Sequence, residues 1–305
     1  MLPFLLRRAG LSLVSIIGLI ALVFFLTRLT GDPTALFLPP DATPEARAEF
    51  ARLQGLDAPI PIQFLTYLRD LLVLDFGDSL RQNRPAMDIA LEAFPRTLQL
   101  AVVALTLSVT IAVTLGCLAA NRPGGPTDRL VSVVSLAGAS VPDFWIAIVG
   151  ILIFAVSFGV LPTSGTGSAA HYVLPVFVLM LRPTGLLVQV VRGSMISALN
   201  AEYIKTARAK GVPRRRILVH HALRNSALPV ITVAGDLAAS LVNGAVVVET
   251  IFGWPGIGKL MIDAISQRDF AVVQATIIVT ALAIFVLNIV VDVLYVRLDP
   301  RISHA

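Results

Sequence analysis

The chain has 305 residues, of which 56% are hydrophobic and 14% are charged, and its net charge is +5. An ordinary soluble domain is about half apolar and about a quarter charged, so this composition excludes a soluble globular protein and predicts an integral membrane protein. The excess of basic residues therefore bears on membrane topology, and we expect no nucleic-acid partner.

A helix needs about 20 mostly apolar residues to cross the hydrocarbon core, because lipid offers no partner to a free backbone N–H or C=O. Six segments meet this requirement, which predicts an all-α protein with six transmembrane helices. These spans are residues 9–29, 97–120, 130–158, 172–191, 227–248 and 271–293. The first could instead be a signal peptide, since Arg7 and Arg8 precede it. Its apolar core exceeds the usual ~7–15 residues and no Ala-x-Ala site follows, so we expect an uncleaved anchor.

The segment between the first two spans, residues 31–95, is predicted to form short helices. Thr43 suits an N-cap and Pro44 a first helical position, and residues 61–74 carry apolar side chains at helical spacing. A segment with so little core of its own is expected to pack on the outer ends of the spans.

Basic residues are distributed unequally between the segments that connect the spans. If the N-terminus is cytoplasmic, the inner segments include the strongly basic loop 192–226, whereas the outer segment 31–95 holds ten acidic residues and five arginines. The positive-inside rule therefore predicts that both termini lie in the cytoplasm.

The basic loop has the pattern of two short helices. Asn200 suits an N-cap, and Glu202 is an acidic residue of the kind favoured in the first turn of a helix. Gly211 is typical of the residue that ends a helix. Pro213 prevents continuation and can begin a second helix over residues 214–225. On charge alone, the loop could simply be a solvated segment near anionic lipid headgroups.

The motif within this loop favours a more specific interpretation. The run from Glu202 to Gly211, with His221-Ala222-Leu223-Arg224-Asn225 and Leu228-Pro229 after it, resembles the EAA loop of binding-protein-dependent ABC transporter permeases of the dipeptide and oligopeptide branch. The resemblance implies that the first helix is a coupling helix that docks in a groove of a cytoplasmic ATPase. Residues assigned to docking on this basis are Glu202, Tyr203, Thr206, Ala207, Lys210 and Gly211. Lys205 stands where the broader family has a glutamate, as it does in the peptide branch.

Two further segments extend the resemblance over nearly the whole chain. Residues 29–33 and 55–80 are similar to the outer segment of the first permease subunit of peptide and nickel importers. Residues 249–258, continuing to 268–270, resemble the family's loop between the fifth and sixth spans.

Part of that loop also matches most of a phosphate-binding P-loop, from Gly253 to Gly258 and Lys259. Leu260 stands where a hydroxyl should bind Mg²⁺, Pro255 removes a backbone donor, and the predicted topology puts the loop outside. We therefore expect a structural turn here, and ATP and Mg²⁺ on separate ATPase subunits.

Three charged residues lie about half-way across predicted spans: Asp143, Arg182 and Asp236. A charge at this depth costs about 2.5 kcal/mol or more, so such residues usually form pairs or line a wet path. Asp236, Ser240 and Asn243 fall at i, i+4 and i+7, on one face of the fifth span. Two roles stay open and compatible: a buried pair of Arg182 with Asp143 or Asp236, or a translocation path lined by these five residues.

No residues indicate chemistry on this chain. The single cysteine, Cys117, excludes a disulfide framework, and the four histidines are not placed as helical ligand pairs on a span, so we expect no metal site. An intramembrane hydrolase would need a buried nucleophile with a base at similar depth, and the sequence offers no such pair.

We therefore expect residues 1–305 to form one transmembrane domain, a permease subunit in the bacterial inner membrane rather than an enzyme. The resemblance implies a second homologous permease as a heterodimer partner, two ATPases and an extracytoplasmic solute-binding protein. Short peptides are the expected substrate, and nickel chelates, glutathione, opines and sugars are the alternatives.

Overall fold

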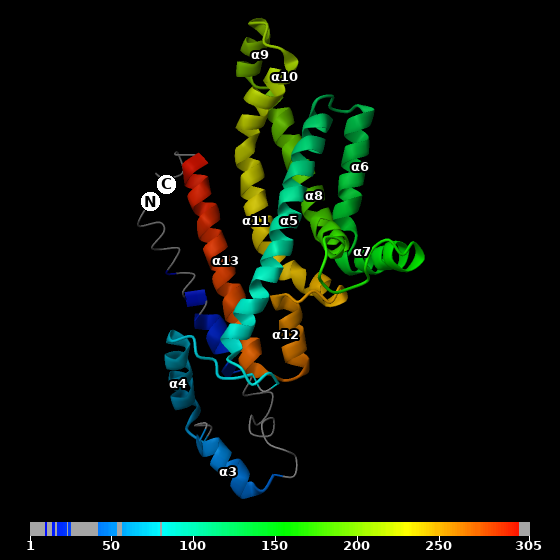
Figure 1. The fold of residues 1–305 in the computed structure, drawn as a ribbon. Helices are drawn as coiled ribbons and strands as arrows, with labels where there is room; N and C mark the ends of the chain where they lie inside the picture. The colour runs from blue at the N-terminus through cyan, green and yellow to red at the C-terminus, as the bar shows by residue number, and fades with distance from the viewer. Residues whose placement is uncertain are drawn as a thin grey trace. The chain divides into compact units, whose positions relative to one another are not determined.

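The computed structural model describes residues 42–53, 57–79 and 81–298, together with residues 10, 14–15, 17–22 and 24–25 near the N-terminus (Figure 1). In these residues the chain is helical and contains no β-strand, in agreement with the predicted all-α class. It divides into two compact units, one formed by Met1–Pro95 with Lys259–Phe285, the other by Arg96–Gly258 with Val286–Ala305.

The first unit contains the short helices that the sequence predicts outside the spans. They are α3 (Pro44–Leu53) and α4 (Ile60–Leu72). Thr43 caps α3 as expected, because its Oγ1 accepts a hydrogen bond from the Ala46 N–H at 3.2 Å. The rings of Phe64 and Tyr67 on α4 pack on Phe24, with ring centroids 5.2 and 5.4 Å apart. Helix α4 thus packs on the first predicted span, which is only partly described.

Two long-range contacts complete this unit. The buried Ser79 donates from its hydroxyl to Asp269 Oδ2 at 2.5 Å, which ties the segment before α5 to the N-terminus of α13 (Phe270–Leu298). Helix α12 (Ile257–Ser266) lies just before Asp269 in the sequence. Within it, Lys259 and Asp263 form an ion pair one helical turn apart.

The second unit is built around α8 (Ala170–Leu199), which packs between α6 (Pro126–Ser140) and α11 (Arg224–Ile251). Helix α5 (Ala86–Ala120) contributes to the same core. Small residues permit the close packing: a Cβ at Gly185 of α8 would lie 2.3 Å from the Ser135 carbonyl oxygen of α6. Glycine at such positions lets helix backbones approach closely within a membrane.

Four of the predicted spans are confirmed as long apolar helices. By length and hydropathy, four described helices could each cross a membrane: Ala86–Ala120, Ala170–Leu199, Arg214–Ile251 and Phe270–Val291. These helices contain the predicted spans at 97–120, 172–191 and 227–248 and most of the one at 271–293.

The segment predicted as a span at 130–158 is not one continuous helix, and it breaks beside Pro142, where the proline favours a kink. Helix α6 ends at Ser140, α7 (Asp143–Gly150) begins at Asp143, and the two are bent by 96°. Between them Val141 and Pro142 have extended backbones, with ψ of 135° and 136°. A proline disfavours helical geometry in the residue before it and lacks an N–H of its own, so the helix breaks at this point. A π-helical segment, Ile151–Ser157, continues α7.

Candidate functional site

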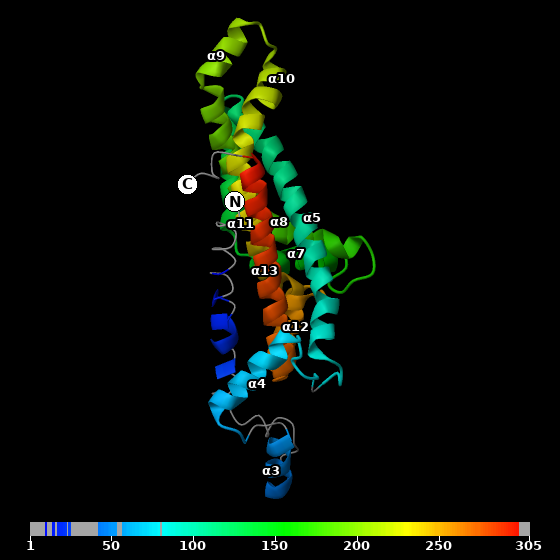
Figure 2. The same ribbon diagram turned by 90° about the vertical axis from the view of Figure 1, so that its left-hand side faces the viewer.

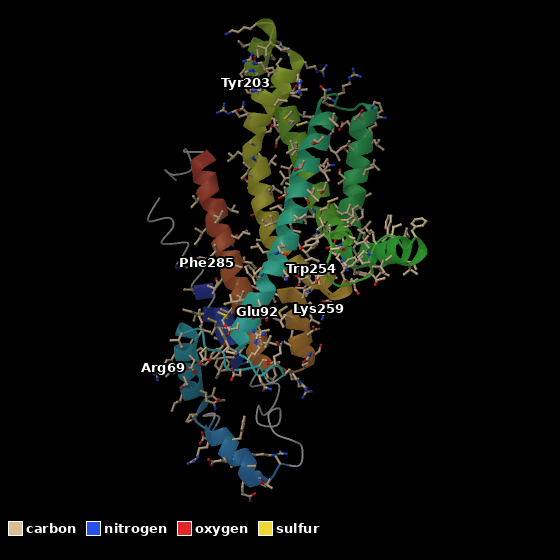
Figure 3. All side chains as sticks on the ribbon, in the orientation of Figure 1. Arg69, Glu92, Tyr203, Trp254, Lys259 and Phe285 are labelled. Carbon is tan, nitrogen blue, oxygen red and sulfur yellow. The ribbon has the colours of Figure 1, made fainter. Side chains whose placement is uncertain are left out.

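The predicted coupling loop forms a helical hairpin at one end of the second unit. Helix α9 (Glu202–Ala209) and α10 (Arg214–Arg216) stand beyond the ends of α5 and α6, and Tyr203 lies near this tip (Figures 2 and 3). The prediction of Asn200 as the N-cap is wrong: Ala201, with an extended backbone, occupies that position, and Asn200 ends α8 instead. The 30-residue helix α8 runs past its predicted end as far as Leu199, although Pro175 and Pro183 lie inside it.

The end of α9 confirms the prediction for Gly211. Its φ of +73° lies in the left-handed region, which only glycine adopts without strain. The Gly211 N–H donates to the Arg208 carbonyl at 2.9 Å, and the Val212 N–H donates to the Ala207 carbonyl at 3.1 Å. These two bonds form a Schellman motif, which fixes the direction in which the chain leaves α9.

The two faces of α9 have different surroundings. Ile204 and Ala207 are buried against Ile217, which anchors the helix to the stem that follows it. Five of the six residues assigned to docking are exposed: Glu202, Tyr203, Thr206, Lys210 and Gly211. The sixth, Ala207, lies on the inner face, so it can only support a docking surface from behind.

The second predicted helix begins at Arg214 as expected, but it does not end near residue 225. Residues Arg214–Ile251 form one continuous helical stretch of 38 residues, with a π-helical segment at Ile217–Leu223. Arg214 also donates from Nη2 to the Asn121 carbonyl at 2.6 Å, which connects the hairpin to the end of α5. The hairpin is thus continuous with the predicted fifth span through one helical stretch.

The polar stripe predicted on the fifth span lies on an exposed face of α11. Asp236, Ser240 and Asn243 are all exposed. Towards α9, a groove of about 650 Å³ opens between α8 and α11, and Tyr203 lines its end. Other residues that line the groove are Gln189, Gly193, Ser197, Asn225 and Pro229. The stripe and the groove therefore follow one another along the same helix.

Asp143 and Arg182, the other two charges in predicted spans, occupy different environments. Arg182 is exposed on α8, and Asp143 is half-buried in the first turn of α7, near enough for the two charges to interact. Within the described residues, no ion pair joins Asp143, Arg182 and Asp236. The structure thus brings Arg182 near Asp143 without forming the predicted pair.

The opposite end of α11 holds a buried carboxylate that the sequence pattern did not single out. Glu249 is fully buried, and it accepts hydrogen bonds from the Thr97 hydroxyl at 2.5 Å and from the Gly258 N–H at 2.8 Å. A Cβ at Gly256 would lie 2.1 Å from Glu249 Oε1. The segment that imitates a P-loop therefore wraps around a carboxylate of its own chain, which makes it the structural turn that its sequence predicted.

Aromatic contacts seal this turn. Trp254, labelled in Figure 3, is fully buried, and its Nε1–H donates to the Arg96 carbonyl at 3.1 Å. Its ring makes a T-shaped contact with the ring of Tyr172, with the two centroids 4.6 Å apart. These partners are far from Trp254 in sequence, so only a family pattern, and no local rule, pointed to this segment.

A second unpredicted interaction lies near the hairpin end of the unit. Asp128, in the first turn of α6, is buried and pairs with Arg192 of α8 through both carboxylate oxygens. The Gly124 N–H donates to the same carboxylate at 2.7 Å. The pair fixes α6 to α8 beside the start of the basic loop.

The part of the chain that the structure describes contains no cluster of three His, Cys, Asp or Glu residues able to hold a metal ion. The described residues thus form an exposed helical hairpin, a groove lined by both polar and apolar side chains, and a buried turn.

Comparison with known proteins identifies a shared fold and similar sequences. The structure resembles the inward-facing methionine ABC transporter MetNI, with a TM-score of 0.60 and 16% sequence identity over 70% of this chain and 97% of that one, which shows a shared fold. The oligopeptide transport system permease protein AppB of Bacillus subtilis is 35% identical over the full length of both chains. The di/tripeptide transport system permease protein DppB of Pseudomonas aeruginosa is 38% identical, covering 100% of this chain and 99% of that one.

Family models account for most of the sequence. A model for the N-terminal region of binding-protein-dependent transport membrane components matches residues 1–101. The model for the binding-protein-dependent transport system inner membrane component matches residues 112–304. The chain belongs to this family of inner membrane transport components.

Proposed function

We propose that this chain is one permease subunit of an ATP-driven importer of short peptides. The observation that carries the proposal is the α9 hairpin, which presents an exposed face at the end of a continuous 38-residue helix. Relatives that match along the whole chain are peptide transport permeases by name, which supports short peptides as the substrate class.

The proposed subunit has six transmembrane helices and cytoplasmic termini. The four long apolar helices and the bent pair of α6 and α7 supply five spans, and residues 9–29 supply the sixth. Basic residues concentrate at the α9 hairpin, and the positive-inside rule supports a cytoplasmic position for it.

Docking of an ATPase on α9 would use Glu202, Tyr203, Thr206, Lys210 and Gly211, with Ala207 supporting them from the inner face. Because α10 and α11 are one helical stretch, a displacement of the hairpin reaches the polar stripe directly. ATP binding by the ATPases then biases the balance between inward-open and outward-open states.

The translocation path, in this proposal, runs along Asp236, Ser240 and Asn243 of α11, with Asp143 and Arg182 beside it. A second, homologous permease completes the path as a heterodimer partner, and an extracytoplasmic binding protein delivers the solute. ATP and Mg²⁺ belong to the two ATPase subunits.

The test is uptake of a labelled dipeptide in cells that lack this gene, with and without a plasmid copy. We expect uptake to disappear with the gene and to return with the copy, and an ATPase subunit to co-purify with the tagged chain. Unchanged uptake would refute the peptide assignment, and nickel chelates, glutathione, opines and sugars would be tested next. Failure of any ATPase to co-purify would refute the importer assignment itself.

A further inference from the structure

The exposed faces of α8 and α11 border the same groove. On α8, Arg182, Leu186, Gly193 and Ser197 are exposed and follow one another at intervals of four, seven and four residues, which places them on one face. On α11, Asn225, Pro229, Asp236 and Ser240 are exposed at the same intervals. Gly193, Ser197, Asn225 and Pro229 line the groove of about 650 Å³. Arg182 and Asp236 therefore continue the two walls of that groove.

The two charged residues also lie at the same level along the helices. The core between α8 and α11 consists of two clusters, one that includes Leu179 and Leu241 and one that includes Leu187 and Val230. Arg182 lies between Leu179 and Leu187 on α8, and Asp236 lies between Val230 and Leu241 on α11. An exposed cation on α8 and an exposed anion on α11 thus lie at the level where the two clusters meet.

Neither of these charges has a partner of its own among the described residues that would hold it in an ion pair. Arg182 lies near enough to the half-buried Asp143 for their charges to interact, and Asp236 shares an exposed face of α11 with Ser240 and Asn243. Charges at mid-membrane are costly unless water, a pairing group or a bound solute compensates them. Their position on the helix faces that continue the groove favours a bound solute that carries both signs of charge.

We propose that Arg182 and Asp236 form a binding station for a zwitterionic short peptide, with the peptide carboxylate at Arg182 and its ammonium at Asp236. The proposal rests on the proposed function. Packed helices lie about 8–10 Å apart, and an extended chain covers about 3.3–3.6 Å per residue, so di- and tripeptides have the length that bridges the two side chains. Arg is suited to the role because its guanidinium binds a carboxylate through two parallel hydrogen bonds.

The test measures peptide binding to the complete purified transporter in lipid nanodiscs, without binding protein, so that only the permease selects the ligand. Labelled alanyl-alanine is displaced by unlabelled alanyl-alanine, by its N-acetyl form or by its C-terminal amide. In the wild type, we expect each modified peptide to compete about tenfold less well, because each leaves a charged group of the station unpartnered.

The variants separate the two halves of the station. Asp236→Asn should abolish discrimination against the N-acetyl peptide and keep that against the amide, and Arg182→Gln should do the reverse. Asp236→Glu should retain both. Asp88→Asn and Arg129→Gln, which neutralise exposed charges on α5 and α6, should change neither.

Three results would overturn the station: no binding of alanyl-alanine to a transporter that imports it in cells, equal competition by all three peptides, or variants that discriminate as the wild type does. Each leaves the proposed function intact, because peptide uptake in cells tests that function separately. ATP hydrolysis by each reconstituted variant checks that the complex is assembled.

Discussion

The two ends of α11 differ in how they are held. At one end, Glu249 and Trp254 are fully buried and their polar atoms are bonded to distant parts of the second unit. At the other end, the helix extends through a π-helical segment into a hairpin whose inner face rests on three buried side chains. One end of α11 is thus a buried turn, and the other end continues into an exposed hairpin.

This difference indicates which end can accept a displacement. Local stability follows buried apolar contact and protected hydrogen bonds, so the sealed turn should keep its geometry while the hairpin moves. π-Helical segments often occur at functional sites within helices, and one of them lies between the hairpin and α11.

Gly211→Asp should have the largest effect on transport. A side chain at φ of +73° strains the Schellman turn, and the added acid alters the exposed face of α9. We expect dipeptide uptake to be abolished while the chain stays in the membrane at normal abundance. Gly159→Asp is the matched control, since Gly159 also has a positive φ, +63°, and open space around it. Normal uptake by the Gly211 variant would remove the basis for docking through α9.

Gly256→Ala should have the largest effect on stability. Its Cβ would lie 2.1 Å from Glu249 Oε1, and that carboxylate cannot move without losing its buried hydrogen bonds. We expect destabilisation of about 3 kcal/mol, measured by thermal denaturation in detergent. Gly244→Ala, on α11 and with nothing within 4 Å of the added Cβ, should be neutral or slightly stabilising. Equal behaviour of the two variants would mean that the turn is not sealed.

Asp128→Ala should have an intermediate effect. The change leaves Arg192 and the Gly124 N–H without their buried partner, although the Arg192 side chain is 29% exposed to solvent. We expect a loss of about 2 kcal/mol in the same thermal assay. Arg129→Ala, one residue away and exposed, should leave the midpoint unchanged. A comparable loss in both variants would show that the effect arises from the helix terminus rather than from the pair.

Lys205→Ala should have the smallest effect on stability. Its ion pair with Glu202 is exposed, with 65% and 84% of the two side chains accessible, and such pairs contribute less than about 1 kcal/mol. The thermal midpoint should stay within error of the wild type. A large fall in the thermal midpoint would show that the exposed face of α9 stabilises the fold, which would contradict the difference between the two ends of α11.

Local signals in the sequence predicted the elements that depend on local physics. Apolar runs of sufficient length gave four of the spans, and the cap at Thr43 and the stop at Gly211 follow from the chemistry of single residues. The position of α9 was correct for the same reason.

Features that depend on distant partners could not be predicted in this way. The Glu249 carboxylate bonds to Thr97, 152 residues away, and Asp128 pairs with Arg192, 64 residues away. Pro142 indicates a kink, but the bend of 96° also depends on the packing of α7 on α8 and α11, which are distant in sequence. The inward direction of Ala207 follows from its contact with Ile217, which lies beyond the turn.

The most direct test of the central claim is photo-crosslinking from the hairpin to the ATPase. A photoreactive phenylalanine analogue replaces the exposed Tyr203 of α9 in one strain and the exposed Val160, in the loop between α7 and α8, in another. The account predicts a crosslink to the ATPase subunit from position 203 and none from position 160. No crosslink from 203 in a transporter that imports peptide, or an equal crosslink from 160, would contradict it.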